Sequence, residues 1–317
     1  ADAFKEAELF LHGSGPSLVA KLQVEQWRKA TDKPWGTGGV TLNPAADKSL
    51  RDLLDTAAFV YTRETKSLEE LKKLNCKSPV LDFAPDATFA VDLRNDEAAT
   101  KLLKTHDLEP GKFLCAIPRL RFTPYWEMHP ERKQDPAEIK RKSDVNAKFA
   151  KEDHGKLCEG ITAWVRKTKG RVLLCPEMTY QADLLQPLLF DPLPDDVKKH
   201  VASLGRYWIT DEASGLYRQA RLMLSGECHS PILAIAHEVP AMYLRQPTDT
   251  WKGQMYPDLG LGEWAPEVEK VTGMEVAERL LAIEANYPAA QQLAKKAKEL
   301  AAKKHTALAG TIKKLLG

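Results

Sequence analysis

Short apolar runs alternate with amphipathic stretches through the first third of the chain. The apolar run at residues 7–12 has the length of a strand, and residues 17–30 place apolar side chains at helical spacing. Further strands are predicted at 34–42, 58–62 and 80–83, with helices at 50–55 and 67–74 between them. Ser67 is predicted to cap the last of these helices, with Glu70 completing a capping box. This β-α-β order predicts a parallel sheet with helices on both faces.

The remainder of the chain repeats the alternation after a predicted linker at residues 108–111. Strands are predicted at 113–118, 171–175, 207–210, 222–225 and 240–244, and helices at 144–167, 182–189, 197–204, 212–220 and 230–237. Residues 123–144 are rich in proline and charge, which is typical of a functional loop or a mobile segment. Residues 274–316 are basic and alanine-rich, and their apolar spacing predicts helix that packs on the domains.

These elements predict an α/β fold of two doubly wound, Rossmann-like domains that face each other, followed by a helical tail. The predicted segments are residues 1–110, 111–272 and 273–317. Ligands of such sheets bind outside the carboxyl ends of the strands. The residues that directly follow predicted strands are therefore the candidates for chemistry.

Composition narrows the class of partner without identifying one. The 317 residues include 46 basic and 44 acidic side chains, a net charge of +2 that gives no reason to expect nucleic acid. The five cysteines are scattered and none lies in a CxxC pair, so neither structural zinc nor a disulfide framework is predicted. No apolar run reaches the ~18 to 20 residues of a membrane span, and no signal peptide is recognisable. We expect a cytoplasmic protein without metal or other cofactor, and its oligomeric state stays open.

Gly13, Ser14 and Gly15 follow the first predicted strand and precede a helix. Small residues at a helix N-terminus allow backbone N–H groups to hold an anion. Every tight turn between a strand and a helix also favours glycine. The segment therefore predicts either an anion site or a simple turn.

Arg119 and Arg121 directly follow the strand predicted at 113–118, which is apolar like the buried strands of parallel sheets. Arginine binds carboxylates and phosphates in bidentate fashion, so both are candidate ligands for an anionic substrate. The alternative is a place on the surface beside the charged segment at 123–144.

Glu227 and His229 lie between the strand at 222–225 and the helix at 230–237. The positive end of a helix dipole favours a neutral, basic imidazole, which with Glu227 nearby could exchange protons with a substrate. The alternative is a histidine that caps the helix or satisfies a buried polar group. Among the other histidines His12 is the one rival, because it ends a strand. Five other histidines have charged sequence neighbours, which are typical of a surface position: His106, His129, His154, His200 and His305.

Several blocks of the sequence share an order and spacing with one known family. Residues 7–14 (AELFLHGS) join a strand to small residues, and residues 33–41 (KPWGTGGVT) join Lys-Pro to a strand and glycines. Residues 60–71 (VYTRETKSLEEL) place Arg63-Glu64 after a strand, and Pro85-Asp86-Ala87 follow. Residues 113–119 form a strand ending in Arg119, and residues 220–252 combine a strand, His229, an apolar helix, a second strand and Lys252. In this order the blocks resemble the polysaccharide pyruvyl transferase family over residues 5–265.

The resemblance implies a GT-B-like fold and a reaction with phosphoenolpyruvate. The family transfers enolpyruvate from phosphoenolpyruvate to a sugar, making a pyruvate ketal of bacterial surface polysaccharides, so the implied partners are phosphoenolpyruvate and a sugar or glycan acceptor. By resemblance His229 is assigned to acid/base work and Arg119 to the anionic groups of the donor. The other substrate-binding residues that it implies are Arg121, Glu227, Arg63, Asp86, Lys252, Gly13 and Ser14.

The chain departs from the family pattern at two places. The family has Arg-x-His where this chain has Glu227-x-His229, and a carboxylate there repels an anionic donor. Arg121, Arg218 and Arg221 are candidates for a compensating cation. Family members also begin with a further strand and glycine-rich loop, so we expect the first domain to lack that block.

Two other functions stay open at this point. One is a GT-B-type glycosyltransferase that uses a nucleotide sugar, with Glu227 holding a ribose or sugar hydroxyl. The other is a catalytically silent family member that binds glycans.

Overall fold

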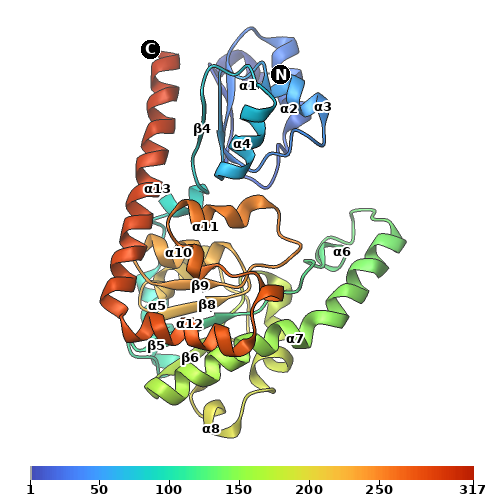
Figure 1. The fold of residues 1–317 in the computed structure, drawn as a ribbon. Coiled ribbons are helices and arrows are strands. Elements are labelled where there is room, and N and C mark those ends of the chain that lie inside the picture. The colour runs from blue at the N-terminus through green and yellow to red at the C-terminus, as the bar shows by residue number, and fades with distance from the viewer. Residues whose placement is uncertain (1) are drawn as a thin grey trace. The chain divides into compact units, whose positions relative to one another are not determined.

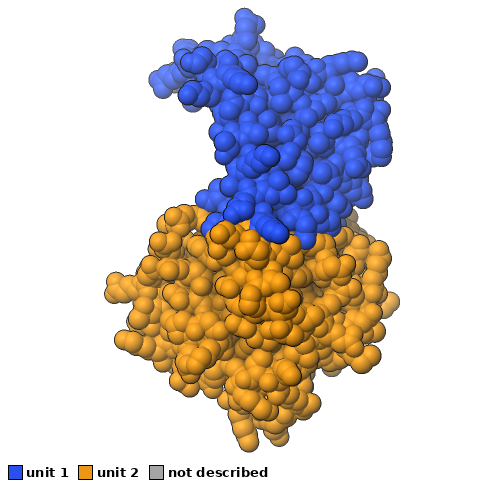
Figure 2. Space-filling model, turned by 60° about the vertical axis from the view of Figure 1, so that its left-hand side comes forward, with its two compact units in different colours: residues 1–90, 249–260, 296–317 blue, residues 91–248, 261–295 orange. Residues whose placement is uncertain are grey.

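The computed structural model describes residues 2–317, which divide into two compact units (Figures 1 and 2). Unit 1 contains the residues up to Ala90 together with 249–260 and 296–317, and unit 2 contains 91–248 and 261–295. The boundary therefore lies at residue 90 and not at 110. Helix α5 (Asp96–Thr105) belongs to unit 2, because it packs there against α9 (Thr210–Tyr217). The expected third segment, 273–317, is shared between the two units.

The sheet of unit 1 has four parallel strands in chain order. They are β1 (Phe10–His12), β2 (Trp35–Val40), β3 (Phe59–Thr62) and β4 (Leu81–Phe83), connected by α2 (Lys21–Ala30), α3 (Lys48–Leu54) and α4 (Thr65–Lys73). Right-handed crossovers that all run in one direction place their helices on one face. The main core of unit 1 lies there, with Val24, Trp27, Trp35 and Val60 buried in one cluster.

The other face of this sheet is covered by the end of the chain. Phe59 and Tyr61 of β3 pack against Leu308 and Ile312 of α13 (Tyr287–Leu316). The Tyr61 hydroxyl also lies 2.8 Å from Thr311 Oγ1. The predicted packing of the C-terminal helix is thus observed within unit 1.

The sheet of unit 2 is doubly wound. Its five parallel strands lie in the order β7-β6-β5-β8-β9. Their bounds are Phe113–Ile117 (β5), Arg171–Leu174 (β6), Val201–Ser203 (β7), Leu222–Ser225 (β8) and Ala241–Tyr243 (β9). The strand order reverses between β5 and β8, and this switch point is where ligands of such sheets bind. The four strands of unit 1 that the structure describes show no such reversal.

Helices cover both faces of the sheet of unit 2. The crossover through α7 (Pro136–Thr168) and the one through α10 (His229–Ala236) run in opposite directions, so the two helices lie on opposite faces. Helix α12 (Gly273–Ala285) packs beside α7 (Figure 1). Because α7 begins at Pro136, capped by Asp135, the segment expected to be a loop is shorter than predicted. It contains one helical turn, α6 (Tyr125–Met128).

Three local predictions were wrong. Residues 197–204 form the edge strand β7 after a helical turn, α8 (Asp195–Lys198), and residues 207–210 form no strand because α9 begins at Thr210. Ser67 lies inside α4, whose N-cap is Glu64. The Ser67 hydroxyl donates to the Glu64 carboxylate and accepts the backbone N–H of Leu42, so it makes no capping box.

Short helical elements complete the described chain. They are α1 (Asp2–Glu6), η1 (Ala87–Ala90), η2 (Thr179–Leu184), η3 (Leu185–Phe190), η4 (Trp251–Gln254), α11 (Met255–Asp258), η5 (Gly262–Trp264) and η6 (Val268–Lys270). Within residues 2–317, no helix combines the length and the apolar character needed to cross a bilayer.

Candidate functional site

The switch point of unit 2 brings together residues that follow β5 and β8. Arg119 Nη1 lies 3.4 Å from Glu227 Oε2, and both side chains are buried. Gly226 makes this approach possible, since a Cβ at that position would lie 2.9 Å from the Cβ of Arg119. The Gly226 N–H donates to Ile117 O at the end of β5 (2.9 Å). Both predicted residues therefore lie at the carboxyl edge of the sheet and are paired with each other.

His229 is the first residue of α10 and contacts a carboxylate that follows β6. Because a carboxylate only accepts, His229 Nδ1 donates to Glu177 Oε1 (3.2 Å), while Glu177 Oε2 accepts the backbone N–H of Ser230 (2.7 Å). The imidazole is 42% exposed and the Glu177 side chain only 14%. Burial by itself raises the pKa of Glu177, but the bonds from His229 and Ser230 outweigh it and lower that pKa. His229 and Glu177 thus form an oriented imidazole–carboxylate pair that faces solvent.

Glu227 is also held from the side of β6. Gln181 Nε2 donates to Glu227 Oε1 at 2.7 Å, and the same amide nitrogen lies 3.3 Å from the Tyr180 hydroxyl. Burial, reinforced by the negative charge of Glu227, raises the pKa of Tyr180. Neither Glu177 nor Gln181 was singled out from the sequence, although Glu177 follows a predicted strand more closely than Arg121 does.

His154 supports the backbone of the site from α7. Its Nδ1 donates to Ala150 O (2.6 Å), which leaves Nε2 to accept the backbone N–H of Arg119 (3.2 Å). Burial lowers the pKa of His154, so the ring is neutral. The prediction that His154 lies at the surface was wrong, since its exposed fraction is 1%.

The arginines considered as compensating cations are engaged elsewhere. Arg121 makes a bidentate pair with Asp153, at 2.8 and 3.0 Å, and its guanidinium lies 3.5 Å from the centre of the Phe149 ring. Arg218 pairs with Asp96 at 2.7 Å. Arg221 pairs with Glu284 beside the amino end of β8. The structure therefore brings none of the three beside Glu227, and Arg121 stabilises the loop after β5.

In unit 1 a buried ion pair lies at the carboxyl ends of β3 and β4. Arg63 Nη1 donates to Asp86 Oδ2 (2.7 Å) and Arg63 Nε to Thr41 Oγ1 (3.1 Å). Arg63 Nη2 is buried without a hydrogen-bond partner among residues 2–317. Thr41 in turn donates to Glu64, whose pKa is raised by burial. The structure thus brings the predicted residues Arg63 and Asp86 together.

The remaining predicted residues have structural contacts in unit 1. Ser14 Oγ donates to Gly39 O (3.2 Å) and accepts the backbone N–H of Ala87, which ties the turn after β1 to β2 and to the segment after β4. The turn at Gly13 was expected to lead directly into a helix. Helix α2 begins only at Lys21, so that helix N-terminus does not lie at the turn. Lys252 Nζ, in η4, lies 3.2 Å from Asp249 Oδ1.

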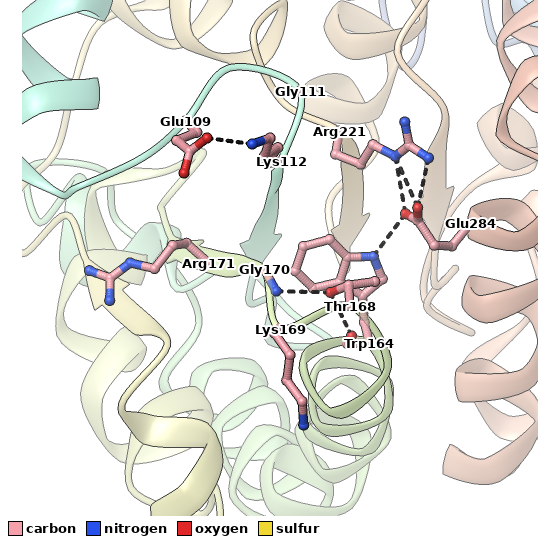
Figure 3. Close-up of a pocket in the computed structure, with 10 residues that line it drawn as sticks. All are labelled: Glu109, Gly111, Lys112, Trp164, Thr168, Lys169, Gly170, Arg171, Arg221 and Glu284. Atoms are coloured by element: carbon pink, nitrogen blue, oxygen red, sulfur yellow. Dashed lines mark hydrogen bonds and ion pairs between the residues drawn. The ribbon is translucent and has the colours of Figure 1, made fainter.

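A cavity of about 340 Å³ lies at the opposite end of the unit 2 sheet (Figure 3). It is lined by residues that precede β5, β6 and β8, among them Lys112, Gly170 and Arg221. Arg221 and Trp164 both donate to Glu284 there, so its central polar groups are already paired. Because ligands of doubly wound sheets bind at the carboxyl ends, this cavity is not the candidate site. No group of three or more His, Cys, Asp or Glu side chains in the described chain is arranged to hold a metal ion.

Comparison with known sequences identifies one family. The polysaccharide pyruvyl transferase family matches residues 33–246, which is more than half of the chain. This segment includes Arg63, Asp86, Arg119, Glu227 and His229. No curated protein sequence matches.

Solved structures with the same fold are distant in sequence. S. aureus MnaA, described as a UDP co-structure, has a TM-score of 0.58 and 9% identity, over 93% of this chain and 74% of that one. Anabaena Alr3699/HepE, in complex with UDP and glucose, has a TM-score of 0.56 and 12% identity, over 99% and 79%. The UDP-forming α,α-trehalose-phosphate synthase from Burkholderia xenovorans, in complex with glucose-6-phosphate, has a TM-score of 0.56 and 10% identity, over 98% and 74%. At these identities the likeness shows the fold alone, which is α/β and GT-B-like as predicted.

Proposed function

The chain belongs to the polysaccharide pyruvyl transferase family, and from this premise we propose that it transfers an enolpyruvyl or pyruvyl group from phosphoenolpyruvate to a sugar hydroxyl. We further propose a cytoplasmic location and a role in the assembly of a bacterial surface polysaccharide. The single observation that supports this activity best is the His229–Glu177 pair at the switch point of unit 2.

The proposed reaction moves a proton at three atoms, which are the two attacking hydroxyl oxygens of the sugar and C3 of phosphoenolpyruvate. A sugar hydroxyl adds to C2 of phosphoenolpyruvate and loses its proton, while C3 gains a proton and becomes a methyl group. A second hydroxyl of the sugar then loses its proton and replaces the phosphate at C2, which closes the ketal and releases inorganic phosphate. An imidazole titrates near neutral pH, so one group can accept a proton in one step and donate it in another.

His229 suits this task because Glu177 fixes its orientation. With Nδ1 bonded to the carboxylate, Nε2 is the nitrogen that exchanges protons with the substrate, and Glu177 stabilises the imidazolium that forms. The Glu177 carboxylate also offsets the positive end of the α10 dipole beside the ring.

Arg119 is the proposed ligand for the anionic groups of the donor. Its contact with Glu227, at 3.4 Å, is longer than a good charge-assisted hydrogen bond of about 2.7–2.9 Å. We propose that the negative charge of Glu227 weakens the binding of an anionic donor to Arg119. In unit 1, Arg63, Asp86, Lys252, Gly13 and Ser14 stay predicted substrate-binding residues, and the buried Nη2 of Arg63 supports the choice of Arg63.

A glycosyltransferase that uses a nucleotide sugar is the second candidate. The observation that favours it is Glu227, a carboxylate at the place where the family has an arginine that would meet an anionic donor. Glu227 could accept hydrogen bonds from a ribose or sugar hydroxyl. Two of the structures with the same fold are described as complexes with UDP.

Thermal unfolding in the presence of each donor distinguishes the two candidates. A ligand at about 100 times its Kd stabilises the folded state by about 2.7 kcal/mol. We expect phosphoenolpyruvate to raise Tm in a concentration-dependent way, and His229→Ala to abolish transfer without lowering Tm. A shift with a nucleotide sugar and none with phosphoenolpyruvate would reject the proposal in favour of the second candidate. No shift with either would favour the silent, glycan-binding alternative.

A further inference from the structure

Gln181, in η2, is a buried side chain whose amide makes four hydrogen bonds at the candidate site. Its Oε1 accepts the backbone N–H groups of Glu177 (2.7 Å) and Met178 (2.9 Å). Its Nε2 donates to Glu227 Oε1 (2.7 Å) and to the Tyr180 hydroxyl (3.3 Å). A side-chain amide offers two donor hydrogens and two acceptor lone pairs, so its whole capacity is used.

These partners permit only one orientation of the amide. The backbone N–H groups are donors, so the oxygen of Gln181 must face them and the nitrogen must face Glu227. A nitrogen of this kind only donates, so Glu227 must accept. The side chain therefore specifies both the place of Glu227 and its role as an acceptor.

The same side chain also determines where Glu177 lies. Glu177 is held through its backbone by Gln181, and its carboxylate binds the His229 ring and the N-terminus of α10. Gln181 is thus bonded both to Glu177, whose carboxylate binds the His229 ring, and to Glu227, which lies two residues before His229.

We propose that Gln181 is a positioning residue, which acts on the reaction through Glu177 and Glu227 and touches no substrate. This inference rests on the proposed function for its kinetic test only. Its structural consequence is that the imidazole of His229 keeps one tautomer, protonated at Nδ1, as long as Gln181 holds Glu177 in place.

Two substitutions of Gln181 test the kinetic part. Gln181→Met removes all four hydrogen bonds and is expected to lower kcat by about tenfold to a hundredfold at every pH, with a smaller change in KM, since misplacement of about 1 Å can cost that much. Gln181→Glu keeps the shape but places a second carboxylate against Glu227. Two such carboxylates share a proton when the pH falls, which restores a donor at this position. The loss of kcat in Gln181→Glu should therefore shrink as the pH is lowered, while that of Gln181→Met should not.

The control is Gln186→Met. Gln186, in η3, donates to Asp191 through an exposed side-chain bond (2.6 Å), and its replacement should leave kcat unchanged. An equal loss in Gln181→Glu at every pH, or no loss in either Gln181 variant, would overturn the proposal. If Gln181→Met does not fold, the kinetic test rests on Gln181→Glu alone, because its loss of kcat must be reversed when the pH is lowered.

A readout without substrate separates this inference from the proposed function. In protein labelled with ¹⁵N at histidine, the ring signals of His229, assigned by their loss in His229→Asn, report the tautomer of the neutral ring. We expect protonated Nδ1 in the native protein and a mixture of tautomers in Gln181→Met. An unchanged tautomer in Gln181→Met would reject the positioning role even if transfer from phosphoenolpyruvate were demonstrated. A changed tautomer would support it even if phosphoenolpyruvate proved not to be the donor.

Discussion

Replacing Glu227 by glutamine should tighten the binding of phosphoenolpyruvate. Glu227 lies 3.4 Å from Arg119, the proposed ligand of the donor's anionic groups. A donor carboxylate on the other side of the guanidinium would lie roughly 6 Å from Glu227, and at an effective dielectric constant of about 20 two such charges repel by about 3 kcal/mol. Glu227→Gln removes this repulsion and keeps an oxygen to accept the bond from Gln181. We expect Kd to fall by about tenfold to a hundredfold, since each 1.4 kcal/mol is a factor of about ten.

Isothermal titration of phosphoenolpyruvate into the native protein and the variant measures this change. The matched control is Glu284→Gln, which alters a carboxylate–arginine pair beside the amino end of β8 and should leave Kd unchanged. A Kd for Glu227→Gln that equals or exceeds the native value would refute the argument that Glu227 opposes an anionic donor.

Two further predictions concern stability. Asp153→Asn breaks the buried bidentate pair with Arg121 and leaves this guanidinium paired with the half-exposed Glu269, so the free energy of unfolding should fall by about 1–3 kcal/mol and Tm by roughly 2–12 °C. Calorimetry that shows no change in Tm would contradict a structural role for Arg121. His154 is neutral in the folded state because burial lowers its pKa, whereas in the unfolded chain it takes up a proton below about pH 6.5. Stability should therefore fall as the pH drops from 6.5 toward the lower folded pKa, by at most about 1.4 kcal/mol per pH unit from this group. Urea unfolding at several pH values measures how the free energy of unfolding changes with pH. This dependence on pH should be weaker in His154→Gln and native in His129→Gln, which changes a half-exposed ring.

Most strands could be predicted because parallel strands buried on both faces are continuous apolar runs. β5 is such a run, β8 is apolar up to its last residue, Ser225, and every residue of both strands is buried. β7 is different, since its three residues, Val-Ala-Ser, pair with β6 at the edge of the sheet and have no pattern of their own. Its strand conformation depends on pairing with β6, and this tertiary contact cannot be predicted from the local sequence pattern.

The position of His154 could have been predicted from helical spacing. Its immediate neighbours are charged, which indicated a surface position. The residues three and seven positions later, Leu157 and Ile161, are buried on the same face of α7. For the burial of His154, helical periodicity is therefore a better guide than the charge of the neighbouring residues.

The candidate site was predictable in part. Arg119 and His229 follow strands and were found by that rule, and Arg63 and Asp86 came from the family resemblance. The His229–Glu177 contact joins residues 52 positions apart, and the Gln181–Glu227 bond joins residues 46 positions apart. Such contacts depend on which strands become neighbours in the sheet, and β6 and β8 are brought near each other only by lying on either side of β5.

Transfer of labelled carbon from phosphoenolpyruvate to a sugar tests the central claim most directly. The protein is incubated with ¹³C-labelled phosphoenolpyruvate and a panel of mono- and oligosaccharides, and the products are followed by NMR. We predict a labelled methyl group in a pyruvate ketal together with released phosphate, and neither product with His229→Ala of native Tm. Ketal formation by His229→Ala at the native rate would contradict the account, as would a native protein that transfers sugar from a nucleotide sugar and no label from phosphoenolpyruvate.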